Sequence, residues 1–106
     1  MPHKIHTDHH GVIVKSLNKG HTYEVDVAGQ KTRLDFQTGS VERNGLNGMT
    51  TEALLAILIH RTKFLNVAVP CDENDRAIRH MEDALANLEV RSTRRITRGV
   101  DGTKAI

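Results

Sequence analysis

Two kinds of hydrophobic pattern divide the chain near Thr50. Before this residue, apolar side chains alternate with polar ones in short runs such as GVIVKSL, HTYEVDV and KTRLDF. Alternation with a period of two is typical of strands that bury one face. The runs are separated by Asn18-Lys19-Gly20 and Ala28-Gly29-Gln30, whose glycines suit tight hairpin turns. We therefore predict three or four antiparallel strands between about residues 11 and 44, followed by a linker at residues 44 to 48.

After Thr50 the apolar residues follow the period of a helix. Thr50 is a suitable N-cap, and Glu52 favours the positive end of the helix dipole. The run TEALLAILIHRTKFL is apolar on most sides, which predicts a well-buried helix to about Asn66. A second helix is predicted from about Asp72 to Thr97, with Gly99 ending it. Its narrow seam suits packing on one neighbour. The seam residues recur every three or four positions and are Ile78, Met81, Leu85, Leu88 and Ser92.

These patterns predict a single α+β domain over residues 1–106, in which a small antiparallel sheet precedes a two-helix hairpin. One partner helix cannot cover a first helix that is apolar on most sides, so we expect the protein to self-associate. A chain of this length buries only about 60–70% of its unfolded surface, and small domains often gain stability by forming oligomers.

Composition and charge narrow the classes of function. The net charge of +2 is too small for a general nucleic-acid coat protein, so a basic site must come from local clustering. Cys71 is the one cysteine, which excludes a disulfide framework and favours a reducing cytoplasm. We expect neither a membrane span nor secretion, because no long apolar run and no apolar signal region is seen. Phosphate-loop, nucleophile-elbow and zinc-protease motifs are missing, so we do not expect an enzyme.

The histidine-rich start, HKIHTDHH, is the one candidate metal site. Its possible ligands are His3, His6, Asp8, His9 and His10. Chain ends are usually mobile, so we expect no ordered scaffold to hold these side chains at ligand geometry. We therefore predict neither a metal nor a cofactor.

Arginines near the end of the second predicted helix form the strongest candidate site. In RSTRRITRGVDGT, Arg91 and Arg95 are four residues apart, and so are Arg94 and Arg98. The two pairs would stand on one side of a helix. Guanidinium groups bind phosphate through paired hydrogen bonds, so converging arginines predict a phosphate or pyrophosphate site. The alternative is that these cations complement the helix dipole and remain solvated.

Two other residues are candidates for contact with a nucleobase or a ribose. Phe64 stands near the predicted end of the first helix, where an exposed ring would offer a stacking face. The alternative is a ring that closes the core. Asn74, at the opening of the second helix, could read a base edge or a ribose hydroxyl through its amide, or be an ordinary surface residue.

Taken together, these segments resemble the anti-Thoeris signal sponges, with which phages strip bacteria of an immune second messenger. The resemblance runs over about residues 34–103 and is most specific in GLNGMTTEALLAI and RSTRRITRGVDGT. The helical hairpin is also similar to that of the phage anti-CBASS sponges, which bind cyclic oligonucleotides. Residues 1–20 match no motif of the family.

The resemblance implies a small antiparallel sheet followed by two helices, in dimers that sometimes assemble into hexamers. It implies that glycocyclic ADP-ribose binds at the subunit interface and is not cleaved. Phe64 would then stack the adenine, and Asn74 would hydrogen-bond the ribose or the base. Arg91 and Arg95 would hold the pyrophosphate. The remaining pair, Arg94 and Arg98, would strengthen the field or bind a second anion.

The chain also departs from the family, and other functions stay open. Between the helices, NVAVPC at residues 66–71 replaces a glycine-proline-phenylalanine stretch, which leaves the preferred linkage isomer open; the tail after Thr103 differs too. One rival is a sponge for cyclic di- or trinucleotides, alone or in addition. Another is a small DNA- or RNA-binding phage protein, against which the net charge argues. A third is an enzyme that hydrolyses the messenger. In each case we expect the protein to act in the cytoplasm of an infected bacterium.

Overall fold

The computed structural model describes residues 2–98, apart from the side chains of Arg95, Thr97 and Arg98. The chain forms two compact units, Met1–Met49 and Thr50–Ile106. An antiparallel sheet occupies the first and a helical hairpin the second, which confirms the predicted α+β class. The boundary between the units falls where the hydrophobic pattern changes period.

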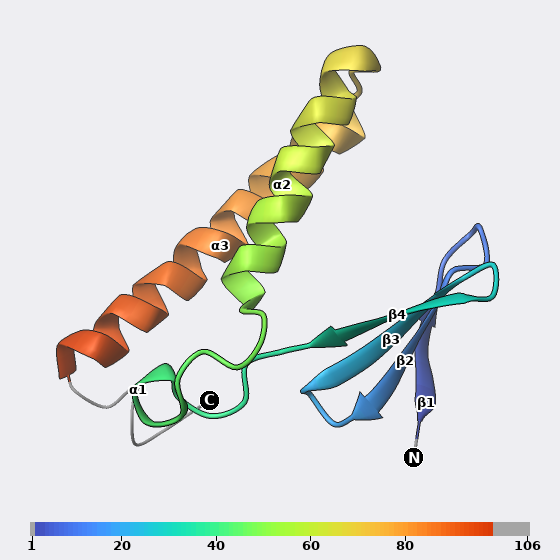
Figure 1. Cartoon of the computed structure of the whole chain (residues 1–106). Coiled ribbons are helices and arrows are strands. Elements are labelled where there is room, and N and C mark those ends of the chain that lie inside the picture. The colour runs from blue at the N-terminus through green and yellow to red at the C-terminus, as the bar shows by residue number, and fades with distance from the viewer. Residues whose placement is uncertain (1, 99–106) are drawn as a thin grey trace. The chain divides into compact units, whose positions relative to one another are not determined.

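Four strands make up the sheet: β1 (His3–Thr7), β2 (Ile13–Asn18), β3 (Thr22–Val27) and β4 (Gln30–Asp35). Each strand pairs antiparallel with the next along the chain, in the order β1-β2-β3-β4 (Figure 1). The predicted sheet region, residues 11 to 44, therefore begins too late and ends too late.

Strand β1 corrects the expectation that the histidine-rich start has no ordered scaffold. His3 lies opposite Ser16 and His6 opposite Val14, so the ladder to β2 orders this segment. Because both faces of β1 are exposed, its side chains carry no hydrophobic alternation that could have revealed it. Among residues 2–98, no three His, Cys, Asp or Glu side chains converge to hold a metal ion.

The hairpin turns form where the glycines predicted them. Between β3 and β4, Ala28 and Gly29 both have positive φ, +52° and +89°, as the preferred two-residue hairpin turn requires. Asp26 supports this turn, since its Oδ1 accepts a 2.8 Å hydrogen bond from the Gly29 N–H. Between β1 and β2, Asp8 accepts from the N–H groups of Val12 and His10, and this holds the pKa of the Asp8 carboxyl below its usual value.

A short helix follows the sheet, in a loop that side-chain amides close by hydrogen bonds. Residues 41–44, at the end of the region predicted to hold the strands, instead form α1 (Val41–Asn44), because Ser40 caps it by accepting from the Arg43 N–H. Gln37 and Asn47 close the surrounding loop: the Asn47 N–H donates to Gln37 Oε1 at 3.0 Å. The Asn47 side chain also bonds both the N–H and the carbonyl of Thr38, at 2.9 Å each. This part of the GLNG motif is thus structural.

The hairpin consists of α2 (Thr51–Ala68) and α3 (Asp72–Arg98), which run side by side in opposite directions (Figure 1). Thr50 is confirmed as the N-cap of α2, since its Oγ1 accepts from the Ala53 N–H at 3.1 Å. The predicted seam of α3 is confirmed as well: Ile78 is buried, and the other four seam residues are half-buried. The expected end at Gly99 lies outside the described residues.

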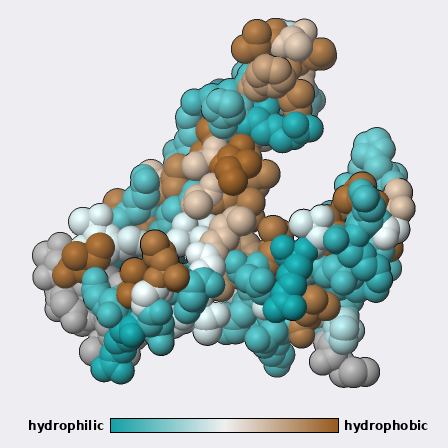
Figure 2. All heavy atoms as spheres, viewed as in Figure 1, coloured by the Kyte–Doolittle hydropathy of each residue, from teal (hydrophilic) through white to brown (hydrophobic). Residues whose placement is uncertain are grey.

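The prediction that α2 is well buried is wrong for the single chain. Ile59 is its one buried residue, because α3 covers only one side of the helix. Apolar side chains gather on the exposed surface of α2 and near its junction with α3 (Figure 2). They are Ile57, Leu58, Phe64, Leu65, Val67 and Val69. No helix in the described part of the chain has both the length and the hydropathy needed to cross a membrane.

Candidate ligand-binding site

Phe64 is the exposed member of the chain's three aromatic residues. Tyr23 and Phe36 are half-buried and meet edge to face, with ring centroids 5.7 Å apart and planes at 89°. Phe64, in contrast, is 70% exposed on α2, one turn before the helix ends. The alternative of a ring that closes the core does not hold within a single chain, and a stacking face is available.

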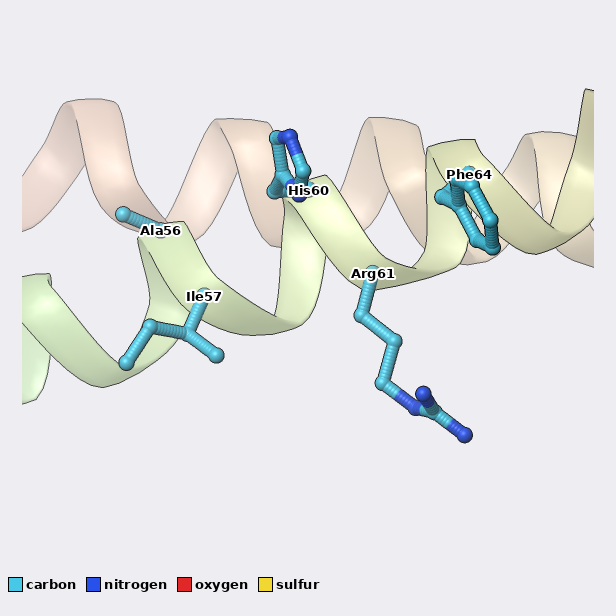
Figure 3. Close-up of a pocket in the computed structure, with 5 residues that line it drawn as sticks. All are labelled: Ala56, Ile57, His60, Arg61 and Phe64. Carbon is cyan, nitrogen blue, oxygen red and sulfur yellow. The ribbon is translucent and has the colours of Figure 1, made fainter.

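The Phe64 ring lines an open hollow on α2. The hollow has a volume of about 510 Å³ and is lined by Ala56, Ile57, His60, Arg61 and Phe64. In Figure 3 the rings of His60 and Phe64 lie along one side of α2, while Ile57 and Arg61 extend on the other. His60 and Arg61 were not predicted as site residues. Their positions, four and three residues before Phe64, were the available signal, because such neighbours share a helix surface.

Asn74 lies near the same end of the hairpin, in the first turn of α3. It is half-buried, in line with the seam, and no hydrogen bond of its amide is found within residues 2–98. The junction beside it is fixed by Asn66, whose amide donates to Asp75 at 2.8 Å and accepts from the Cys71 N–H at 3.1 Å. Asn66 was noted only as a departure from the family pattern, yet its hydrogen bonds order the α2–α3 junction beside Asn74.

The arginines belong to the other end of α3. Arg91 and Arg94 are exposed, and neither forms an ion pair with a described carboxylate. The backbones of Arg95 and Arg98 are helical, whereas their side chains lie outside the described residues. Ser92 Oγ donates a 2.8 Å hydrogen bond to Glu52 Oε2, which holds this end of α3 against the start of α2. Sequence reasoning placed Ser92 in the seam but missed this bond.

A single hairpin does not bring the predicted residues together. Arg91 follows Asn74 by seventeen residues of continuous helix, a rise of about 26 Å. Phe64 and Asn74 therefore stand near the α2–α3 junction, while the arginines stand at the opposite end. A small ligand that contacts both groups must bridge two copies of the chain.

A second hollow, of about 390 Å³, lies between α2 and α3 and is lined in part by His60, Lys63, Glu82 and Glu89. Lys63 and Glu82 form an ion pair across it, with Nζ and Oε2 2.9 Å apart. Because the Lys63 ammonium is already engaged with a carboxylate, this hollow is a poor site for an anion.

Comparison with known proteins identifies the family. The hairpin domain described as Acb2/Tad1 matches residues 29–90, more than half of the chain. The chain belongs to the Acb2/Tad1 hairpin family. It is also 42% identical over 79 residues to a protein of Bacillus phage SBSphiJ7 named Thoeris anti-defense 1. That alignment covers 74% of this chain but 56% of the relative, so the chain spans a little over half of the relative's length.

The family match bears differently on the two groups of site residues. Phe64 and Asn74 fall inside the matched range, whereas Arg91 and the arginines after it lie beyond residue 90. The resemblance seen in GLNGMTTEALLAI is confirmed at the level of the family. The ligand contacts of all six residues stay predictions.

Proposed function

We propose that this protein is a phage anti-defence protein that binds an immune second messenger, glycocyclic ADP-ribose, and withholds it without cleaving it. Membership of the Acb2/Tad1 hairpin family supports this function, as does the name of the Bacillus phage relative. The observation that carries the proposal is the 70% exposed ring of Phe64 beside an open hollow, in a chain that buries its other two aromatics in part.

Each part of the messenger has a matching group on the hairpin. Phe64 stacks the adenine, and the half-buried amide of Asn74 hydrogen-bonds the ribose or the base. Arg91 and Arg95 bind the pyrophosphate through paired, charge-assisted hydrogen bonds. Arg94 and Arg98 add to the positive field or hold a second anion.

The site is built from two copies of the chain in this proposal. The rise of about 26 Å between Asn74 and Arg91 prevents one copy from supplying both ends. A second hairpin that docks antiparallel to the first brings its arginines to the Phe64 end of the first hairpin. The arginines of the first hairpin then lie at the Phe64 end of the second. Such a two-fold interface makes two equivalent sites. The exposed apolar side chains of α2 are the surface that this docking covers.

Withholding a scarce messenger requires tight binding rather than chemistry. A dissociation constant near 1 nM corresponds to about −12 kcal/mol. Stacking on an aromatic ring contributes about 1–3 kcal/mol, and a hydrogen bond to a charged group about 1.5–3 kcal/mol. Several such contacts, in an interface that excludes water, are sufficient for this affinity. No step needs a general base, so the messenger leaves unchanged, in the cytoplasm of the infected host.

The direct test is to incubate the purified protein with extract from cells whose Thoeris defence has been triggered. After washing, the protein is denatured by heat, and the released small molecules are identified by mass spectrometry. We expect intact glycocyclic ADP-ribose. Release of a hydrolysed product would show an enzyme instead, and release of nothing would contradict the proposal.

Calorimetry separates the remaining rival ligands. Titration with cyclic di- and trinucleotides shows whether these messengers bind as well, alone or beside glycocyclic ADP-ribose. Affinity for generic oligonucleotides that falls steeply with salt would instead indicate a nucleic-acid-binding protein.

A further inference from the structure

Arg61 lines the same hollow as Phe64, whereas Lys63, although adjacent to Phe64 in sequence, does not. It precedes Phe64 by three residues of α2, a spacing that places Cβ atoms about 5–6 Å apart on one helix surface. Both side chains are exposed and line the same hollow, together with Ala56, Ile57 and His60 (Figure 3). In Figure 3 the guanidinium extends away from the ring, and a change of rotamer along the flexible arginine stem brings it to a molecule that stacks on Phe64.

Arg61 also differs from the other charged residues of α2 in having no ion-pair or hydrogen-bond partner among the residues that the structure describes. Lys63 pairs with Glu82 across the hairpin, and Glu52 accepts the hydrogen bond from Ser92. Within residues 2–98, no carboxylate lies at ion-pair distance from Arg61. An arginine stem is flexible and its five donors suit phosphate oxygens. This guanidinium is thus free to bind an anion that enters the hollow.

We infer that Phe64 and Arg61 form a purine-nucleotide subsite within a single chain, in which the ring stacks the base and the guanidinium binds the phosphate on the same nucleoside. The inference rests on the proposed function and deepens it, because it adds an anion-binding residue beside the base. In a nucleotide, one ribose separates the base from its 5′-phosphate, so adjacent side chains can hold both. The distant arginines then take the remaining charge of a larger ligand.

A subsite within one chain should bind small ligands by itself, whereas a site that needs residues of two chains should not. Simple purine nucleotides should bind it without any contribution from Arg91 or Arg95. Their affinity should depend on the phosphate, since a nucleoside offers only the base for stacking. ADP and adenosine are therefore suitable probes, and NMR titration of the purified full chain detects even weak binding.

We expect ADP to bind more tightly than adenosine. Arg61→Ala should weaken ADP binding by about 10- to 100-fold, the loss that follows from removing a charge-assisted hydrogen bond. It should leave adenosine binding unchanged. Arg61→Lys keeps the charge but loses the planar guanidinium, so its ADP affinity should lie between that of the wild-type protein and that of Arg61→Ala. Arg79→Ala is the matched control, because Arg79 is an exposed arginine of α3 outside this hollow and has no ion pair among the described residues.

The outcomes separate this inference from the function on which it rests. Phe64→Ala should weaken both probes and the whole messenger. If Phe64→Ala weakens the messenger but neither arginine variant at residue 61 changes ADP binding, the subsite is wrong and the proposed function stands. The subsite is also wrong if wild-type protein shows no preference for ADP over adenosine, or if Arg79→Ala has the same effect as Arg61→Ala. If Phe64→Ala leaves messenger binding unchanged, the proposed site fails as a whole.

Discussion

Tyr23 and Phe36 of the sheet unit pack against each other, whereas Phe64 of the hairpin unit offers its ring to its surroundings. The same contrast holds for the polar and apolar groups nearby. In the sheet unit, Gln37 and Asn47 close their loop through mutual hydrogen bonds. In the hairpin unit, α2 buries one residue and leaves an apolar surface exposed. The sheet unit thus packs its two aromatic rings against each other, whereas the hairpin unit leaves its ring and much of the apolar surface of α2 exposed.

The largest effect is expected when the arginine end of the hairpin is neutralised. Arg91→Ala combined with Arg95→Ala removes the proposed pyrophosphate contacts, each of which is worth about 1.5–3 kcal/mol. Messenger affinity measured by calorimetry should fall by about 100-fold or more, without loss of helix by circular dichroism. Normal binding by the double variant would show that the pyrophosphate is held elsewhere.

The contrast between the aromatic residues predicts opposite consequences for two phenylalanine substitutions. Phe36→Ala should cost about 2–4 kcal/mol of unfolding free energy, because it leaves a gap beside Tyr23. Phe64→Ala should leave stability nearly unchanged and weaken messenger binding by about 5- to 150-fold, the value of one stacked base. Thermal melts and calorimetry on both variants test the pair. A destabilised Phe64→Ala protein with normal binding would reverse the assignment.

Self-association should depend on the apolar surface of α2 and not on isolated exposed leucines. Leu65 is 44% exposed within that surface, whereas Leu46 is 77% exposed on a polar loop of the sheet unit. Leu65→Glu places a charge in the proposed interface and should shift the protein toward monomer at micromolar concentration. Leu46→Glu should not. Sedimentation analysis distinguishes them, and a dimer that survives Leu65→Glu would remove α2 from the interface.

A smaller effect is expected in the turn between β3 and β4. Ala28 has a φ of +52°, which is unfavourable for a residue with a Cβ. Ala28→Gly should therefore stabilise the protein by about 0.5–1 kcal/mol. Gly29→Ala should destabilise it by a similar amount, although a Cβ there would meet no neighbour within 4 Å. Chemical denaturation of the two variants checks the opposite signs, and equal signs would contradict the turn geometry.

The smallest effect concerns acid pH and Asp8. Hydrogen bonds from the Val12 and His10 N–H groups lower the pKa of this carboxyl below its usual value in the folded protein. The turn is therefore stabilised above the unfolded pKa, and this contribution is lost as the pH falls through the lower folded value. The amide resonances of Val12 and His10 should titrate together at a pH below the ordinary pKa of an aspartate. Asp8→Asn should abolish that step, and its persistence would assign it to another group.

Much of the fold was predictable from the sequence because local rules decided it. The glycines between β2, β3 and β4 marked the turns, Thr50 marked the start of α2, and three- and four-residue spacing marked the seam of α3. Strand β1 and helix α1 were missed for physical reasons. The ladder to β2 orders β1 although both its faces are exposed, and α1 depends on a single capping serine.

The candidate site was predictable as a set of residue types but not as an arrangement. Phe64, Asn74 and the arginines stood out by their chemistry and by their resemblance to the family. Their division between the two ends of the hairpin follows from the length of α3, which separates Asn74 from Arg91 by seventeen residues. Arg61 was overlooked because a lone arginine on an apolar helix forms no motif, and only the hollow beside Phe64 shows what it adjoins.

The central claim is that each site takes Phe64 from one copy and arginines from another, and mixing two defective variants tests it most directly. Phe64→Ala and Arg95→Ala proteins are each titrated with messenger, then mixed in equal amounts, exchanged through mild denaturation and titrated again. In a two-fold dimer, random exchange should restore about a quarter of the wild-type sites at wild-type affinity, because each mixed dimer contains one intact site. If mixing restores no binding, the residues act within a single chain and the composite site is contradicted.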